Sequence, residues 1–88
     1  MAQWIKANNE TSTVTPTSGS TFKLEEMQEF VGGYIQLVHA SNGDVIVLDE
    51  EGKIKEKPIN RIATELYEHG HLDPIVGDVL VCASDEVD

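Results

Sequence analysis

The sequence is poor in positive charge, in cysteine and in long apolar segments. Its 88 residues include six Lys and Arg against sixteen Asp and Glu, which gives a formal net charge of -10. Proteins that hold long DNA or RNA place clustered Lys and Arg on the phosphates, so this balance argues against a long nucleic acid as partner. The longest apolar runs, 79–83 and 45–48, fall far short of the roughly 18 residues of a membrane helix. We therefore expect no membrane association.

The single cysteine, Cys82, excludes an internal disulfide and fits a reducing compartment. The first residues lack the apolar segment of a secretory signal, so we expect a cytoplasmic protein. The chain is short enough for one domain over residues 1–88. A core of this size leaves little net stability without disulfides or metals, and we therefore expect a homo-oligomer.

The first half of the chain shows three local patterns. Residues 3–7 alternate around Trp4 and predict a short strand, whereas residues 8–20 are rich in Ser and Thr and predict a flexible loop. Apolar residues at helical spacing predict a helix over 23–31, capped by Thr21 and ended by Gly32. The pattern then changes to a period of two.

A β-hairpin around Asn42-Gly43 is the strongest prediction, because this dipeptide favours a two-residue turn. Such a turn pairs Ser41 with Asp44 and places His39 opposite Ile46, where we expect a core histidine. The second strand, 45–48, is apolar on both faces and should lie inside a sheet, covered by a helix on one side. The sequence does not determine what covers the other side of this strand, and a partner subunit is one of the candidates.

The second half predicts a turn at Gly52, a charged edge strand at 53–55, and a helix over 61–68 that is capped by Asn60 and ends at Gly70. Residues 75–76 and 79–83 predict a closing strand, and 84–88 an acidic tail with little to bury. The order of elements indicates an α+β domain with a small, mostly antiparallel sheet around the Asn42-Gly43 hairpin and two short helices.

The sequence offers no convincing catalytic set, so we expect a protein that is not an enzyme and needs no cofactor. Cys82 lies in an apolar strand, where cysteine is usually a small buried side chain. A nucleophile, a base and an electrophile cannot be assembled from the remaining residues. His69 and His71, with Asp73 or Glu68, are weak candidates for a metal site, because their spacing matches no common zinc pattern.

The most unusual local feature is a basic segment in an acidic chain. Lys53, Lys55, Lys57 and Arg61 lie within nine positions, and Asn60 marks a helix start that favours an anion. The alternative is a soluble edge strand whose lysines balance Glu50 and Glu51. We define the candidate site as these cations with Asn60 and with two aromatic residues, Tyr34 and Tyr67, that could stack on a base.

Several blocks together resemble a family of small proteins encoded by bacteriophages and mobile elements, a domain of unknown function. The resemblance covers about Trp4 to Cys82, and one departure is Asp49, where the family often has Asn. The blocks are LEEMQ at 24–28, VGGYI at 31–35, DEEGK at 49–53, Pro58 with Asn60, Ala63-Thr64, and IVGDVL at 75–80.

The resemblance implies a phage accessory factor that counters host defence by stoichiometric binding, in the cytoplasm of an infected bacterial host cell. It assigns no catalytic residue. Two hypotheses remain: a homo-oligomer that sequesters a small anionic, nucleotide-like signalling molecule at the basic segment, or an acidic inhibitor or nucleic-acid mimic that docks on a host defence protein.

Overall fold

The computed structural model describes residues 2–87, and a five-stranded antiparallel sheet with two short helices forms its framework. The sheet order is β2-β1-β5-β4-β3. This confirms the predicted α+β class. The elements are β1 (Ala2–Ile5), β2 (Thr11–Val14), α1 (Leu24–Val31), β3 (Ile35–His39), β4 (Val45–Asp49), α2 (Arg61–Leu66), β5 (Val79–Cys82) and a short 3-10 helix, η1 (Ser84–Glu86).

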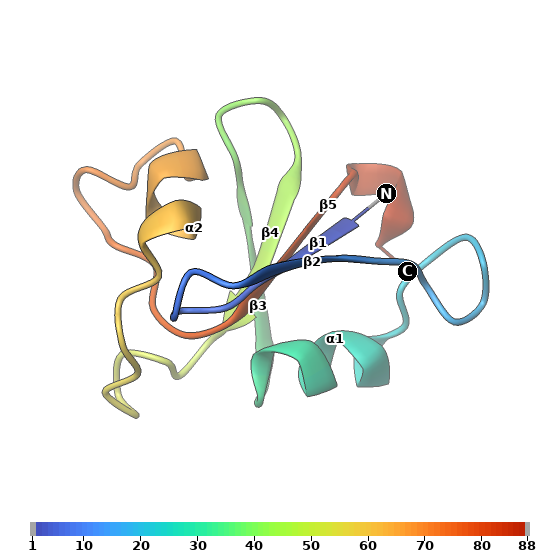
Figure 1. Ribbon diagram of the computed structural model, residues 1–88, viewed down its shortest axis with the longest axis horizontal. Coiled ribbons are helices and arrows are strands. Elements are labelled where there is room, and N and C mark those ends of the chain that lie inside the picture. The colour runs from blue at the N-terminus through green and yellow to red at the C-terminus, as the bar shows by residue number, and fades with distance from the viewer. Residues whose placement is uncertain (1, 88) are drawn as a thin grey trace.

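The two helices cover opposite faces of the sheet (Figure 1). Val45 and Val47 of β4 pack with Met27 of α1, whereas Ile46, the next residue along the strand, packs with Ala63 of α2. This alternation follows from the two-residue period of a strand. Strand β4 is therefore buried throughout, as predicted, and the second cover is α2 of the same chain. A homo-oligomer stays a prediction that this packing does not require.

The β3–β4 hairpin is present, but its predicted register is wrong by one residue. His39 pairs with Val45 and Val38 with Ile46, so the loop comprises Ser41, Asn42 and Gly43. Gly43 has φ 93°, the left-handed position that closes a three-residue loop. His39 is consequently exposed and is not the expected core histidine.

The predicted flexible loop at 8–20 is partly wrong, because Thr11–Val14 forms β2 on the outer edge of β1. Its side chains are mostly exposed, so no apolar alternation marks the strand in the sequence. Because β5 pairs with the other edge of β1, pairing with β2 gives the backbone of β1 hydrogen-bond partners along both edges.

The ends of both helices differ in part from the prediction. The N-cap of α1 is Lys23, not Thr21, and its N–H donates to a Glu26 carboxylate oxygen at 3.3 Å. Gly32 ends α1 with φ 81°, as predicted.

Asn60 caps α2 as expected, accepting a hydrogen bond from Ala63 N–H, but the helix ends at Leu66, before the predicted Glu68 and Gly70. The chain turns there because the Leu66 carbonyl accepts from Ser41 N–H, which joins the end of α2 to the β3–β4 loop.

Two further predictions are wrong at the surface segments. Residues 51–56 form successive turns and not an edge strand, because this segment folds back toward the end of β4. Residues 84–88 are not a tail without contacts: η1 covers 84–86, and Val87 bridges to Phe22 and packs against the α1 side of the core. Asp88 lies outside the described residues.

Within residues 2–87, no helix is long and apolar enough to cross a membrane.

Candidate functional site

Asp49 is a buried carboxylate at the end of β4, with 2% of its surface exposed. Two lysine ammonium groups reach one of its oxygens, Oδ2: Lys57 Nζ at 2.7 Å and Lys55 Nζ at 2.9 Å. The other oxygen, Oδ1, accepts from Glu51 N–H at 2.8 Å. We call Asp49, Lys55 and Lys57 the Asp49 cluster. Both oxygens of the carboxylate are therefore engaged by donors of the chain itself.

The environment of the carboxylate sets its protonation. Burial alone raises the pKa of Asp49, because it removes water from the charged form. Hydrogen bonds from Lys57, from Lys55 and from the Glu51 N–H outweigh that effect and lower the pKa from 3.8 to about 2. In return, the hydrogen bond to Asp49 raises the pKa of Lys55, against a smaller opposing effect of desolvation. Asp49 and Lys55 are both charged at neutral pH.

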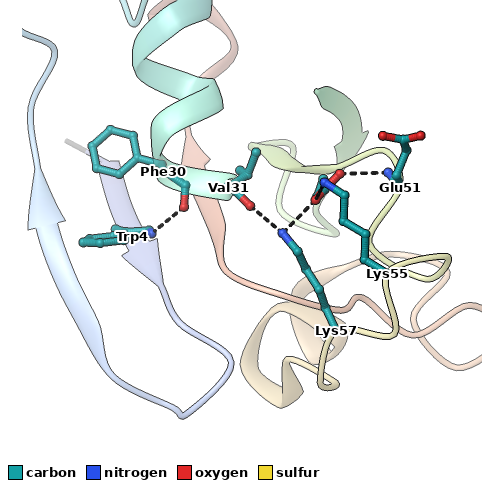
Figure 2. Close-up of polar contacts among 7 residues, drawn as sticks. Trp4, Phe30, Val31, Glu51, Lys55 and Lys57 are labelled. Atoms are coloured by element: carbon teal, nitrogen blue, oxygen red, sulfur yellow. Dashed lines mark hydrogen bonds and ion pairs between the residues drawn. The ribbon is translucent and has the colours of Figure 1, made fainter. Parts of the chain in front are cut away.

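Lys57 also completes the end of α1. Its ammonium group donates to the Val31 carbonyl at 2.8 Å, and the Trp4 indole N–H donates to the neighbouring Phe30 carbonyl at 3.0 Å (Figure 2). The last turn of α1 contains no basic residue of its own. Lys57 therefore supplies, from a remote loop, the positive charge that a helix C-terminus favours.

Two glycines leave room for this cluster. A Cβ atom on Gly33 would lie 2.7 Å from Lys55 Nζ and 2.8 Å from Asp49 Oδ2. A Cβ atom on Gly77, which has φ 78°, would lie 2.8 Å from Lys57 Cδ. The VGGYI, DEEGK and IVGDVL blocks thus meet around one buried carboxylate.

Asn60 is a second buried contact point, with no exposed surface. Its Nδ2 donates at 2.9 Å to the carbonyls of Ile5 and Gly77, and its Oδ1 accepts from Ala63 N–H at 3.0 Å. It joins β1, the start of α2 and the segment before β5. Because its side-chain groups are all engaged inside the protein, Asn60 has no group free to face a ligand.

The structure brings together only part of the predicted basic site. Lys55 and Lys57 meet at Asp49, but Lys53 lies apart and pairs with Asp73. Arg61 is exposed at the start of α2.

The two aromatic candidates lie in different places. Tyr34 is 67% exposed, and it lines a hollow of about 250 Å³ together with Lys55, Gln28, Gly33 and Glu51. Tyr67 instead forms an edge contact with His69, with ring centroids 5.6 Å apart. Each predicted stacking residue shares a hollow with one candidate lysine: Tyr34 with Lys55, and Tyr67 with Lys53 in a smaller hollow of about 100 Å³.

Neither of the other candidate chemistries gains a built site. His69 and His71 are exposed, and residues 2–87 hold no group of three His, Cys, Asp or Glu that could bind a metal ion. Burial raises the pKa of Cys82 to about 11, with smaller contributions from Glu86 and Asp44. A thiol with this pKa is a poor nucleophile at neutral pH.

Sequence reasoning missed a groove beside α1. Trp4 and Phe30 line it, their rings meeting edge to face with centroids 5.3 Å apart. The volume of the groove is about 530 Å³. We call it the Trp4 groove; its other lining residues are Thr13, Val14, Thr15, Thr17, Glu26 and Glu29. The one signal in the sequence was Trp4, an aromatic residue in a predicted short strand. The groove also requires β2, which was not predicted from the sequence.

The chain is a small α+β domain in which Lys53, Lys55 and Lys57 pair with carboxylates of the chain itself. The model of a family described as a domain of unknown function (DUF3846) matches residues 5–88, and the chain belongs to this family. Comparison with curated proteins and with solved structures gave no match.

We predict that Asp49→Asn lowers the free energy of unfolding at neutral pH by about 3 kcal/mol, because it leaves two lysines beside an uncharged buried group. The pKa of Asp49 is lowered in the folded state, so its contribution is complete above pH 4 or so and is lost as pH falls through about 2. Urea unfolding across this range should show the wild type and the variant converging.

Glu50→Gln is the matched control, since the adjacent Glu50 is exposed. It should change stability by less than about 0.5 kcal/mol. Equal stabilities of Asp49→Asn and Glu50→Gln at neutral pH would contradict the structural role of the cluster.

Proposed function

We propose that this protein is a non-enzymatic binding protein that docks through its acidic surface on a basic partner protein. The observation that supports this proposal is the internal use of its lysines. Lys53, Lys55 and Lys57 are paired with Asp73 or Asp49, so the basic segment balances acids of its own chain.

Exposed carboxylates are meanwhile spread over several elements and loops. They lie on α1, on α2, in the turns after β4 and near both ends of the described chain: Glu10, Glu25, Glu29, Glu50, Glu51, Glu56, Glu65, Glu68 and Asp85. With a net charge of -10, such a surface attracts a basic partner over a distance set by the ionic strength. It repels a long nucleic acid for the same reason.

We also propose which class of protein the basic partner belongs to. We infer a basic host defence protein, of the kind whose own surface binds nucleic acid, blocked by a phage accessory protein in the host cytoplasm. Carboxylates on a rigid scaffold imitate the charge of phosphates, and stoichiometric binding needs no catalytic residue. This inference rests on the family resemblance together with the charge.

We predict that the protein binds a polyarginine peptide and that the affinity falls about tenfold or more between about 50 mM and about 200 mM salt. Fluorescence anisotropy of the labelled peptide measures this. An unrelated acidic protein of equal net charge is the control and should bind more weakly by about tenfold. No binding, or binding equal to that of the control, would contradict the proposal.

Nucleotide sequestration is a second candidate, favoured by one observation: Lys55 and the exposed Tyr34 share a hollow of about 250 Å³. Lys55 has a side chain that is 40% exposed, and it can turn from Asp49 toward a phosphate while Lys57 keeps the carboxylate paired. A base could then stack on Tyr34.

This candidate predicts heat of binding when cyclic nucleotides and ADP-ribose derivatives are titrated into the protein. Lys55→Gln should abolish the heat, whereas Arg61→Gln, on the exposed start of α2, should leave it unchanged. Absence of heat with every compound, using folded protein, would reject nucleotide sequestration and leave the acidic-surface proposal standing.

A further inference from the structure

We propose that the Trp4 groove binds a Lys- or Arg-bearing segment of the basic partner. The inference rests on the proposed function, because it names the surface through which the acidic protein would dock. It stands on the shape of the groove, on the aromatic rings that line it and on the sign of its charge.

The aromatic floor of the groove is held in place. The Trp4 indole N–H donates to the Phe30 carbonyl at 3.0 Å, and the two rings pack edge to face at 63°. Figure 2 shows Trp4 and Phe30 side by side at the end of α1. A fixed ring binds a side chain with less loss of conformational entropy than a mobile one.

Trp4 already attracts a cation in this structure. The ammonium group of Lys6 lies 4.5 Å from the centroid of the Trp4 ring, within the range of a cation–π interaction. Tryptophan is the aromatic side chain that makes the strongest contact of this kind. A lysine or arginine of a partner can make the same kind of contact by displacing Lys6 or by approaching the other face of the ring.

The charge of the groove is negative. Glu26 and Glu29 line it, and no Lys or Arg is among its lining residues. Thr17 donates to Glu26 through both its hydroxyl, at 2.7 Å, and its N–H, at 3.0 Å, which holds that carboxylate in place. The Glu29 side chain is exposed, and its carboxylate makes no hydrogen bond or ion pair within residues 2–87, so it remains free for a partner cation.

A second hollow, of about 260 Å³, continues the groove around the end of α1. It shares Trp4, Glu29 and Phe30 with the first and adds Asp78, whose carboxylate accepts from Ala7 N–H at 3.0 Å. Two adjoining hollows offer room for a peptide segment longer than a single amine. Lys57 also borders this second hollow, but its ammonium group is engaged by Asp49 and Val31.

Charge complementarity selects this occupant over the alternatives. A nucleotide phosphate would meet Glu26 and Glu29 and be repelled. A second copy of the chain carries the same net charge of -10 and would be repelled in general. A basic peptide is the occupant that both the aromatic floor and the carboxylates favour.

Trp4 is the only tryptophan of the chain, so its fluorescence reports the groove directly. We expect polyarginine to shift or quench Trp4 emission on binding. Glu29→Gln should weaken binding by about threefold to tenfold. Glu65→Gln removes the same charge from an exposed position on α2, across the sheet, and should weaken it by less than about twofold.

The outcomes separate the two proposals. If the labelled peptide binds by anisotropy, but Trp4 emission is unchanged and the two variants weaken binding equally, the groove is overturned and the acidic surface stands. If no peptide binds, both proposals fail. If sedimentation without peptide shows self-association that Glu29→Gln abolishes, the groove holds a second copy, and the inference is overturned.

Discussion

The buried carboxylate of Asp49 is the constraint on which the rest of this small structure depends. A charge in an apolar interior is costly unless it is paired and hydrogen-bonded, and Asp49 meets that requirement with Lys55, Lys57 and one backbone N–H. Lys57 extends the same pairing to the end of α1. One carboxylate thus ties together β4, α1 and the loop at 50–57, which are distant in the sequence.

This pairing also changes how the charge of the molecule is interpreted. The basic segment is the feature that favours a phosphate ligand in the sequence, yet its lysines neutralise Asp49 and Asp73 within the chain. Within residues 2–87, no buried side-chain nitrogen or oxygen lacks a hydrogen-bond partner. The polar groups of the interior are therefore engaged within the chain, and the exposed carboxylates and the Trp4 groove lie at the surface.

Local signals explain which features could be predicted. Gly32 and Asn60 act through backbone geometry or a hydrogen bond within a few residues, and both were predicted from the sequence. Asn42-Gly43 likewise marks the hairpin, although its loop has three residues instead of the predicted two. The predictions that failed concern features that depend on distant contacts. β2 is visible only as the partner of β1, and the burial of Asp49 requires Lys55, which was predicted to lie on an edge strand, and Lys57, which follows that segment. The Trp4 groove was not predicted for the same reason. Its residues come from separate elements, and none of them is unusual alone.

NMR titration of the Asp49 side-chain carboxyl carbon shows whether this carboxylate holds Lys55 and Lys57 in a structural role. We expect a midpoint at about pH 2, unchanged when nucleotides are added, because the cluster is internal and already paired. A midpoint near the ordinary value of 3.8, or one that moves when a nucleotide binds, would contradict it by showing that the lysines are free to serve a ligand.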